Sequence, residues 1–127
     1  MKNLRNFGFL LLLSAILSCE KQDEKNQEEE SQTLEEQFDK IKKMSESETC
    51  NDESDWDFTA YGNKACGGPV GYIAYPTSIK KEFLKLVEAY AEDQKAYNNR
   101  WGIASTCDIP PAPEWVDCVD GSAVLVY

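Results

Sequence analysis

Residues 78–102, SIKKEFLKLVEAYAEDQKAYNNRWG, decide the fold because they form the clearest element of the chain. Their apolar side chains recur close to a 3.6-residue period, which predicts an amphipathic helix over about 79–100. The apolar stripe consists of Ile79, Phe83, Leu86, Val87, Tyr90, Tyr97 and Trp101. Ser78 is suited to cap the start, and Gly102 stands where a left-handed cap residue is expected. We expect the stripe to pack on a sheet, although aromatic residues at this spacing also suit a ligand groove.

Strands are predicted on both sides of this helix. Residues 56–61 alternate apolar and polar side chains, and 70–75 form a second β-rich run after a glycine-rich turn at 63–69. Residues 115–119 and 122–127 are separated by Asp120-Gly121, a strong hairpin signal. The order strand, strand, helix, hairpin predicts an α+β domain. Its small antiparallel sheet would join the two N-terminal strands and the C-terminal hairpin, packed on one long helix.

Four cysteines, Cys50, Cys66, Cys107 and Cys118, belong to this domain. An even number in a small domain predicts two disulfides and an oxidising compartment, and the spacing does not suit a zinc site. If the first strand and the helix run one way and the second and third strands the other, Cys66 and Cys107 share one end of the domain. Cys118 then lies beside Cys50 at the other end. We therefore predict the pairs Cys66 with Cys107 and Cys50 with Cys118.

The predicted domain spans residues 50–127, a size at which a hydrophobic core is marginal without such staples. Residues 19–49 are predicted to be an acidic tether, because 20–32 contain no apolar residue. Within the tether, Leu34, Phe38 and Ile41 predict a short amphipathic helix at about 34–44. Such a helix is marginal alone, so docking on the domain and waiting for a partner both remain open.

The N-terminus has a basic start, a short apolar run and small residues before Cys19, as secretory signals do. The segment Ile16-Leu17-Ser18-Cys19 resembles the lipobox of bacterial lipoproteins. This resemblance implies that 1–18 is a signal peptide and that Cys19 is acylated and becomes the new N-terminus. More than one lipid chain there would give stable membrane attachment. The alternative is an ordinary secreted protein in which Cys19 is an incidental thiol.

Two further resemblances concern location. Glu20, Asp23 and Glu24 resemble the acidic tags that place some lipoproteins on the outer surface of Gram-negative bacteria, although a solvated spacer explains them equally well. Segments 64–72, 105–108 and 118–121 resemble small exported bacterial domains of unassigned function. These resemblances imply a lipid-anchored protein of the cell envelope, at the outer membrane, and they imply no activity.

Charge and composition exclude several functions. Without residues 1–18 the chain has 23 acidic and 11 basic side chains, a formal charge of −12, which disfavours nucleic acid and anionic membrane surfaces. The chain contains no histidine, so Ser-His and Cys-His nucleophile pairs are absent. We expect a monomer without cofactor, metal or catalytic residues.

Two short motifs are weak candidates for ligand sites. The acidic run 52–57 lacks the spacing of a calcium loop, and nothing singles out a glycosidase-like pair of carboxylates. Cys66-Gly67-Gly68-Pro69 offers backbone amides to an anion, but no lysine or helix start completes a phosphate loop. A tight turn beside a disulfide explains these glycines better.

The proline-rich loop 108–114 is the main candidate binding element, since a stiff extended segment loses little entropy on binding. Its candidate contact residues are Ile109, Pro110, Pro111, Pro113 and the following Trp115. The sequence therefore predicts a non-catalytic binding module for an envelope or extracellular protein or glycan. The alternatives are an inhibitor of a secreted hydrolase acting through this loop, a purely structural crossover, and a carboxylate-based enzyme.

Overall fold

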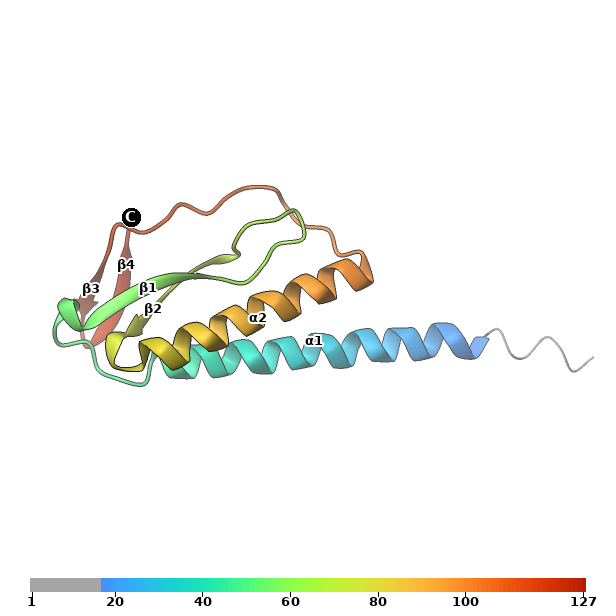
Figure 1. The fold of residues 1–127 in the computed structure, drawn as a ribbon, viewed down its shortest axis with the longest axis horizontal. Coiled ribbons are helices and arrows are strands. Elements are labelled where there is room, and N and C mark those ends of the chain that lie inside the picture. The colour runs from blue at the N-terminus through green and yellow to red at the C-terminus, as the bar shows by residue number, and fades with distance from the viewer. Residues whose placement is uncertain (1–16) are drawn as a thin grey trace, which may run out of the picture.

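The computed structural model describes the backbone of residues 17–127 and, within the first helix, the side chains from Glu24 onward. Two helices and two antiparallel strand pairs make up this part of the chain, which confirms the α+β class. The elements are α1 (Leu17–Ser45), η1 (Glu53–Asp55), β1 (Trp56–Tyr61), β2 (Gly71–Pro76), η2 (Thr77–Ile79), α2 (Lys80–Trp101), β3 (Trp115–Val119) and β4 (Ser122–Val126). Figure 1 shows the two helices along one side of the β1–β2 pair and β3–β4 at one end of the molecule.

Helix α2 follows the predicted stripe closely. Phe83, Val87 and Tyr90 are its buried residues, and Gly102 takes the left-handed cap conformation with φ 60°. The predicted cap by Ser78 is wrong, because Ile79 occupies the N-cap position without a side-chain bond. The Ser78 hydroxyl instead donates to the Glu48 carboxylate, which ties η2 to the segment after α1.

The β1–β2 pair forms the middle layer of the molecule. Trp56 pairs with Pro76 and Tyr61 with Gly71, so successive residue pairs point alternately to opposite faces. Tyr61, Ile73 and Tyr75 contribute to the cluster packed with the helices. Trp56, Phe58 and Ala74 contribute to the cluster packed with β3–β4.

The core on the helical side contains the most deeply buried side chains. Its buried members are Ile41, Tyr75, Phe83, Val87 and Tyr90. The ring of Tyr75 stacks on Phe83 at 4.8 Å between centroids, and Phe38 stacks on Tyr61 at 4.9 Å. Helix α1 thus supplies Phe38 and Ile41 to the same core as α2.

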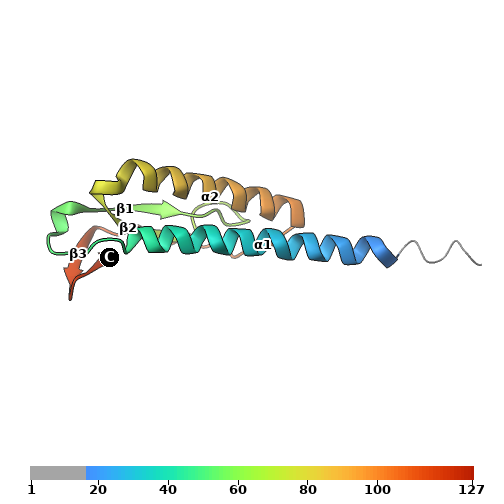
Figure 2. The same cartoon turned by 90° about the horizontal axis from the view of Figure 1, so that it is seen from below.

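Helix α1 corrects the predicted tether and the predicted short helix at 34–44. It extends from Leu17 to Ser45 and runs antiparallel beside α2, as Figures 1 and 2 show. The domain boundary predicted at Cys50 is also wrong, because Ile41 is 1% exposed within the main core. Composition does not predict the N-terminal part of this helix, because there a polar side chain contacts α2, whereas Phe38 and Ile41 attach the C-terminal part by apolar burial. The Glu30 carboxylate accepts from Arg100 and, at 2.8 Å, from the indole N–H of Trp101.

The two strand pairs form separate sheets rather than the single sheet expected. In β3–β4, Val116 faces Leu125 and Cys118 faces Ala123, and these four residues turn inward onto Trp56 and Phe58. Asp120 and Gly121 both have positive φ, 50° and 81°, as the predicted two-residue turn requires. The hairpin therefore stacks on the outer face of β1–β2 instead of extending its edge.

Both disulfides join the pairs that the strand and helix order predicts. Cys50 is bonded to Cys118 and Cys66 to Cys107, each with 5.3 Å between Cα atoms. The first fixes β3 to the segment before β1. The second joins the β1–β2 turn to the segment after α2, so each bridge connects two layers.

Candidate functional site

The proline-rich loop is fixed at both ends. At its start the Lys64 ammonium contacts Asp108, 2.9 Å from Oδ1 and 2.8 Å from the carbonyl oxygen. A side-chain hydrogen bond from Thr106 and the contact with Lys64 lower the pKa of Asp108 to about 2. At its end the Glu114 N–H donates to the Val126 carbonyl at 2.7 Å. The segment between these anchors is therefore held on the protein surface.

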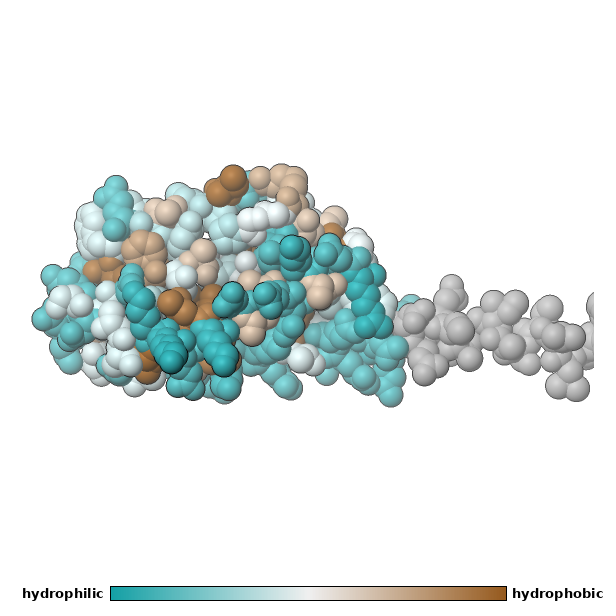
Figure 3. All heavy atoms as spheres, in the orientation of Figure 1, coloured by the Kyte–Doolittle hydropathy of each residue, from teal (hydrophilic) through white to brown (hydrophobic). Residues whose placement is uncertain are grey.

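The five candidate residues of this region have different environments. Ile109 is 79% exposed, and Figure 3 shows apolar spheres at the top of the molecule over the segment between α2 and β3. Pro111 is exposed and Pro110 half-buried, whereas Pro113 is buried. Pro113 therefore belongs to the packed interior and is not a contact residue. Trp115 lies on β3, outside the loop.

Trp115 belongs to an exposed apolar surface that the sequence did not single out. This surface, the hairpin face, consists of Trp115, Asp117 and Val119 from β3 with Val124 and Val126 from β4. Trp115 lies opposite Val126, and Asp117 opposite Val124. Trp115 is 51% exposed, Val119 48% and Val124 42%. The inward residues of both strands are already used in the core, so the hairpin face is left open.

A groove of about 400 Å³ adjoins the hairpin face at Trp115. Its lining residues are Glu53, Ser54, Trp56, Asp57, Phe58, Glu114, Trp115 and Val116. Two indoles and three carboxylates thus share one open surface depression. We call it the tryptophan groove.

Asp57 differs from the other two carboxylates of the tryptophan groove. Partial burial disfavours its charge, but hydrogen bonds from Lys80, the Phe58 N–H and Tyr75 outweigh this and lower its pKa. The Lys80 ammonium lies 3.0 Å and the Tyr75 hydroxyl 3.1 Å from Asp57 Oδ2. Asp57 therefore stays ionised at neutral pH and is unsuited to act as a general acid. Among the residues that the structure describes, Glu53 and Glu114 form no ion pair.

Charge is distributed unevenly around this region. Residues 44–63 include six acidic side chains and residues 101–127 include four, and neither segment has a lysine or arginine. These segments supply η1, β1, the proline-rich loop and the β3–β4 hairpin. Apart from Lys64, the basic residues from position 24 onward all lie on α1 and α2. The segments of the hairpin end are therefore acidic, and the basic side chains that meet them, Lys64 at Asp108 and Lys80 at Asp57, come from other parts of the chain.

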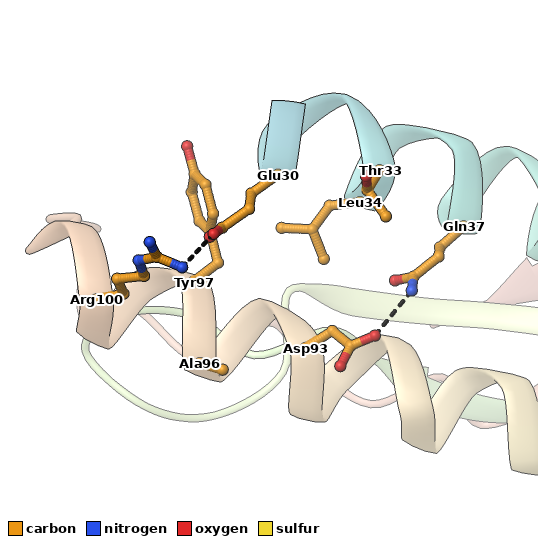
Figure 4. A pocket seen from close by; sticks show the side chains of 8 residues that line it. All are labelled: Glu30, Thr33, Leu34, Gln37, Asp93, Ala96, Tyr97 and Arg100. Atoms are coloured by element: carbon orange, nitrogen blue, oxygen red, sulfur yellow. Dashed lines mark hydrogen bonds and ion pairs between the residues drawn. The ribbon is translucent and has the colours of Figure 1, made fainter. Parts of the chain in front are cut away.

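A second depression lies between the helices, which the sequence does not predict because the composition of residues 20–32 indicates a tether. This interhelical cleft has a volume of about 320 Å³. In Figure 4, Leu34 lies between two polar contacts and Tyr97 lies beside the contact of Glu30 with Arg100. At one end Glu30 binds Arg100, and at the other Gln37 donates to Asp93 at 2.7 Å. These contacts hold α1 on α2. The Gln37 carbonyl oxygen is buried without a partner among the described residues.

The two weak sequence candidates have structural roles. Asp52 caps η1, since its carboxylate accepts from the Ser54 N–H at 2.9 Å. Gly67 and Gly68 have positive φ values of 99° and 82°, and the Gly67 N–H bonds the Lys64 carbonyl within the turn. From residue 24 onward, no group of three or more acidic or cysteine side chains is arranged to hold a metal ion.

Comparison with protein families, with curated proteins and with solved structures finds no match for this chain. Over the described residues, neither helix is long and apolar enough to cross a membrane. The lipobox, with the acylation of Cys19, lies outside the described side chains and stays a prediction.

Proposed function

We propose that the protein is a non-catalytic binding module anchored in the cell envelope by lipid on Cys19, with a protein or glycan of the envelope or the exterior as its partner. The observation that carries the proposal is the open hairpin face. Scattered apolar residues are normal on protein surfaces, but a strand pair presenting Trp115, Val119 and Val124 together is typical of an interaction site.

The arrangement of α1 supports this assignment. Figure 1 places the start of α1 and the β3–β4 hairpin at opposite ends of the molecule. At about 1.5 Å per residue, the helix from position 19 to its end at Ser45 spans roughly 40 Å. A lipid at position 19 would therefore hold the hairpin face away from the membrane, where a soluble or neighbouring partner can reach it.

Lipid attachment is tested first. Substitution Cys19→Ala is expected to abolish metabolic labelling with palmitate and to release the protein from membranes. Ser18→Ala is the matched control, because alanine preserves the small residue before the cleavage point and labelling should persist. Continued labelling of the Cys19→Ala protein would show that the lipobox assignment is wrong.

Binding is tested in the intact chain, because Ile41 places α1 in the core and a fragment 50–127 would lose part of that core. A photo-crosslinking residue at Val124 is expected to give one dominant adduct in living cells. The same residue at Glu88, exposed on α2, is the control position. Equal adducts at both positions, or none at Val124, would contradict binding through this end of the molecule.

A second candidate function rests on Ile109. Its side chain is exposed between the fixed ends of loop 108–114, a geometry that also suits an inhibitor of a secreted hydrolase. Inhibition would appear as stoichiometric loss of a hydrolase's activity that Ile109→Asp abolishes. Retention of inhibition in that variant would eliminate the loop as the inhibitory element.

A further inference from the structure

We propose that the hairpin face and the tryptophan groove bind a protein segment that alternates basic and apolar side chains. This inference rests on the proposed binding function and names the chemistry of the partner. Two observations carry it: the apolar surface of β3–β4, and the absence of any lysine or arginine from the segments that surround it.

The apolar part of the partner would cover Val119, Val124 and the indole of Trp115. Val124 is the diagonal cross-strand neighbour of both Trp115 and Val119, so the three side chains form a diagonal apolar strip with Asp117 at its edge. An extended segment matches such a strip, because every second side chain of a strand points the same way. The basic side chains at its alternate positions start on the opposite face, and their long, flexible stems let them bend back to the acidic margin at the edges of the strip.

The basic part of the partner would meet unpaired carboxylates. Asp117 lies within the hairpin face, and Glu53 and Glu114 line the tryptophan groove next to Trp115. Asp57 is already neutralised by Lys80, at 3.0 Å. An ammonium or guanidinium entering the groove would therefore find two free carboxylates and an indole with which a cation interacts favourably.

Electrostatics disfavour the other occupants of an apolar strip. A second copy would bring its own acidic segments, six side chains from 44–63 and four from 101–127, against the same set. Anionic lipid headgroups would be repelled likewise. A neutral glycan could stack on Trp115, but it has no positive charge to pair with the acidic side chains. Glycan binding is therefore one of the outcomes that the test distinguishes.

The test uses the chain as extracted from membranes in a neutral detergent, with ¹⁵N labelling. A short peptide alternating Lys and Leu is titrated and compared with peptides alternating Glu and Leu or Lys and Ser. We expect amide shifts at residues 114–126 with the Lys-Leu peptide, and binding at least tenfold weaker for the other two. Higher salt should weaken the Lys-Leu complex, because exposed charges are screened.

Variants then separate local from general electrostatics. The double substitution Glu114→Gln with Asp117→Asn is expected to weaken Lys-Leu binding about tenfold, which corresponds to one or two lost ionic contacts. Glu88→Gln with Glu92→Gln removes the same charge from exposed positions on α2 and should leave binding nearly unchanged. Trp115→Ala should also weaken binding about tenfold, whereas Ile109→Ser should not.

Several outcomes would overturn the inference. If the two charge-removing double variants weakened peptide binding equally, the binding would be nonspecific electrostatic attraction to the whole protein. Shifts at 114–126 produced by neutral oligosaccharides but not by the Lys-Leu peptide would assign the face to glycan, and concentration-dependent shifts without ligand would assign it to a second copy. Continued crosslinking of the Trp115→Ala protein to the same partner through Val124 would leave the proposed function standing. That result would refute the alternating basic and apolar chemistry of the partner.

Discussion

The two faces of the β1–β2 pair are covered in different ways. On the helical side, α1 and α2 bury Ile41, Phe83, Val87 and Tyr90 against Tyr75. On the other side, the buried members of the cluster among the described residues are Cys50, Trp56 and Val116, and the Cys50–Cys118 disulfide holds the hairpin in place. The helical side is thus stabilised mainly by packing and the hairpin side by a small core with a covalent bond.

This difference also separates stability from recognition. The helical layer carries both signs of charge, whereas the segments forming the hairpin end carry only acidic side chains. Because the disulfide stabilises the hairpin covalently, the hairpin needs less apolar burial to stay folded. Apolar residues such as Trp115 and Val124 can therefore remain outside the core. The less well packed layer is therefore the one whose apolar side chains are left exposed to a partner.

Removal of the Cys50–Cys118 bridge should have the largest effect. Cys50→Ala with Cys118→Ala is expected to lower the free energy of unfolding by about 5 kcal/mol, of which about 4 kcal/mol comes from chain entropy over a 68-residue separation and the rest from lost burial. Cys66→Ala with Cys107→Ala should cost about 1 kcal/mol less, because both cysteines are exposed. Urea denaturation measures both, and a larger loss for the second pair would reverse the comparison.

Truncation of the helical core comes next. Phe83 is 0% exposed and stacked on Tyr75, so Phe83→Ala should lower the free energy of unfolding by about 4 kcal/mol. Phe58→Ala, on the half-buried hairpin side, should cost about 2 kcal/mol. Thermal or urea unfolding compares the two variants. Equal losses would mean that the two layers do not differ in packing as we infer.

The attachment of α1 provides a smaller test. Glu30→Gln weakens the contacts with Arg100 and Trp101, and we expect a loss of about 1 kcal/mol. Amide hydrogen exchange in residues 24–33 should accelerate while exchange around Ile41 stays slow. Glu28→Gln, at an exposed position, is the control. Unchanged exchange in the Glu30→Gln protein would show that this clamp does not hold the helix.

The smallest expected effect is on acid stability. The pKa values of Asp57 and Asp108 are lowered in the folded state, to about 2 for Asp108 against an ordinary 3.8. Their ionic contacts therefore add stability above about pH 4, and this contribution disappears as pH falls towards 2. Asp108→Asn should flatten the dependence of the urea midpoint on pH between these values. A slope identical to that of the natural chain would rule out this contribution.

Local signals predicted most of the fold. The 3.6-residue stripe predicted α2, Asp120-Gly121 predicted the hairpin turn, and the element order predicted both cysteine pairs. The sequence does not predict the extent of α1, because residues 20–32 contain no apolar residue and the partner of Glu30 lies seventy positions away in the chain. For the candidate site, Ile109 and Trp115 were identified and prove exposed, whereas Pro113 proves buried.

The hairpin face was missed for a different reason. In β3, Trp115 and Val119 point one way and Val116 and Cys118 the other, so both faces carry apolar residues and alternation cannot identify the inner one. Periodicity and turn chemistry, which are local properties, therefore predicted most of the elements, and the resemblance of Ile16-Leu17-Ser18-Cys19 to a lipobox gave the lipid prediction. Only the tertiary structure decided that the hairpin stacks on β1–β2, that α1 completes the core, and that an acidic, apolar surface stays open, because these depend on contacts between residues distant in the chain.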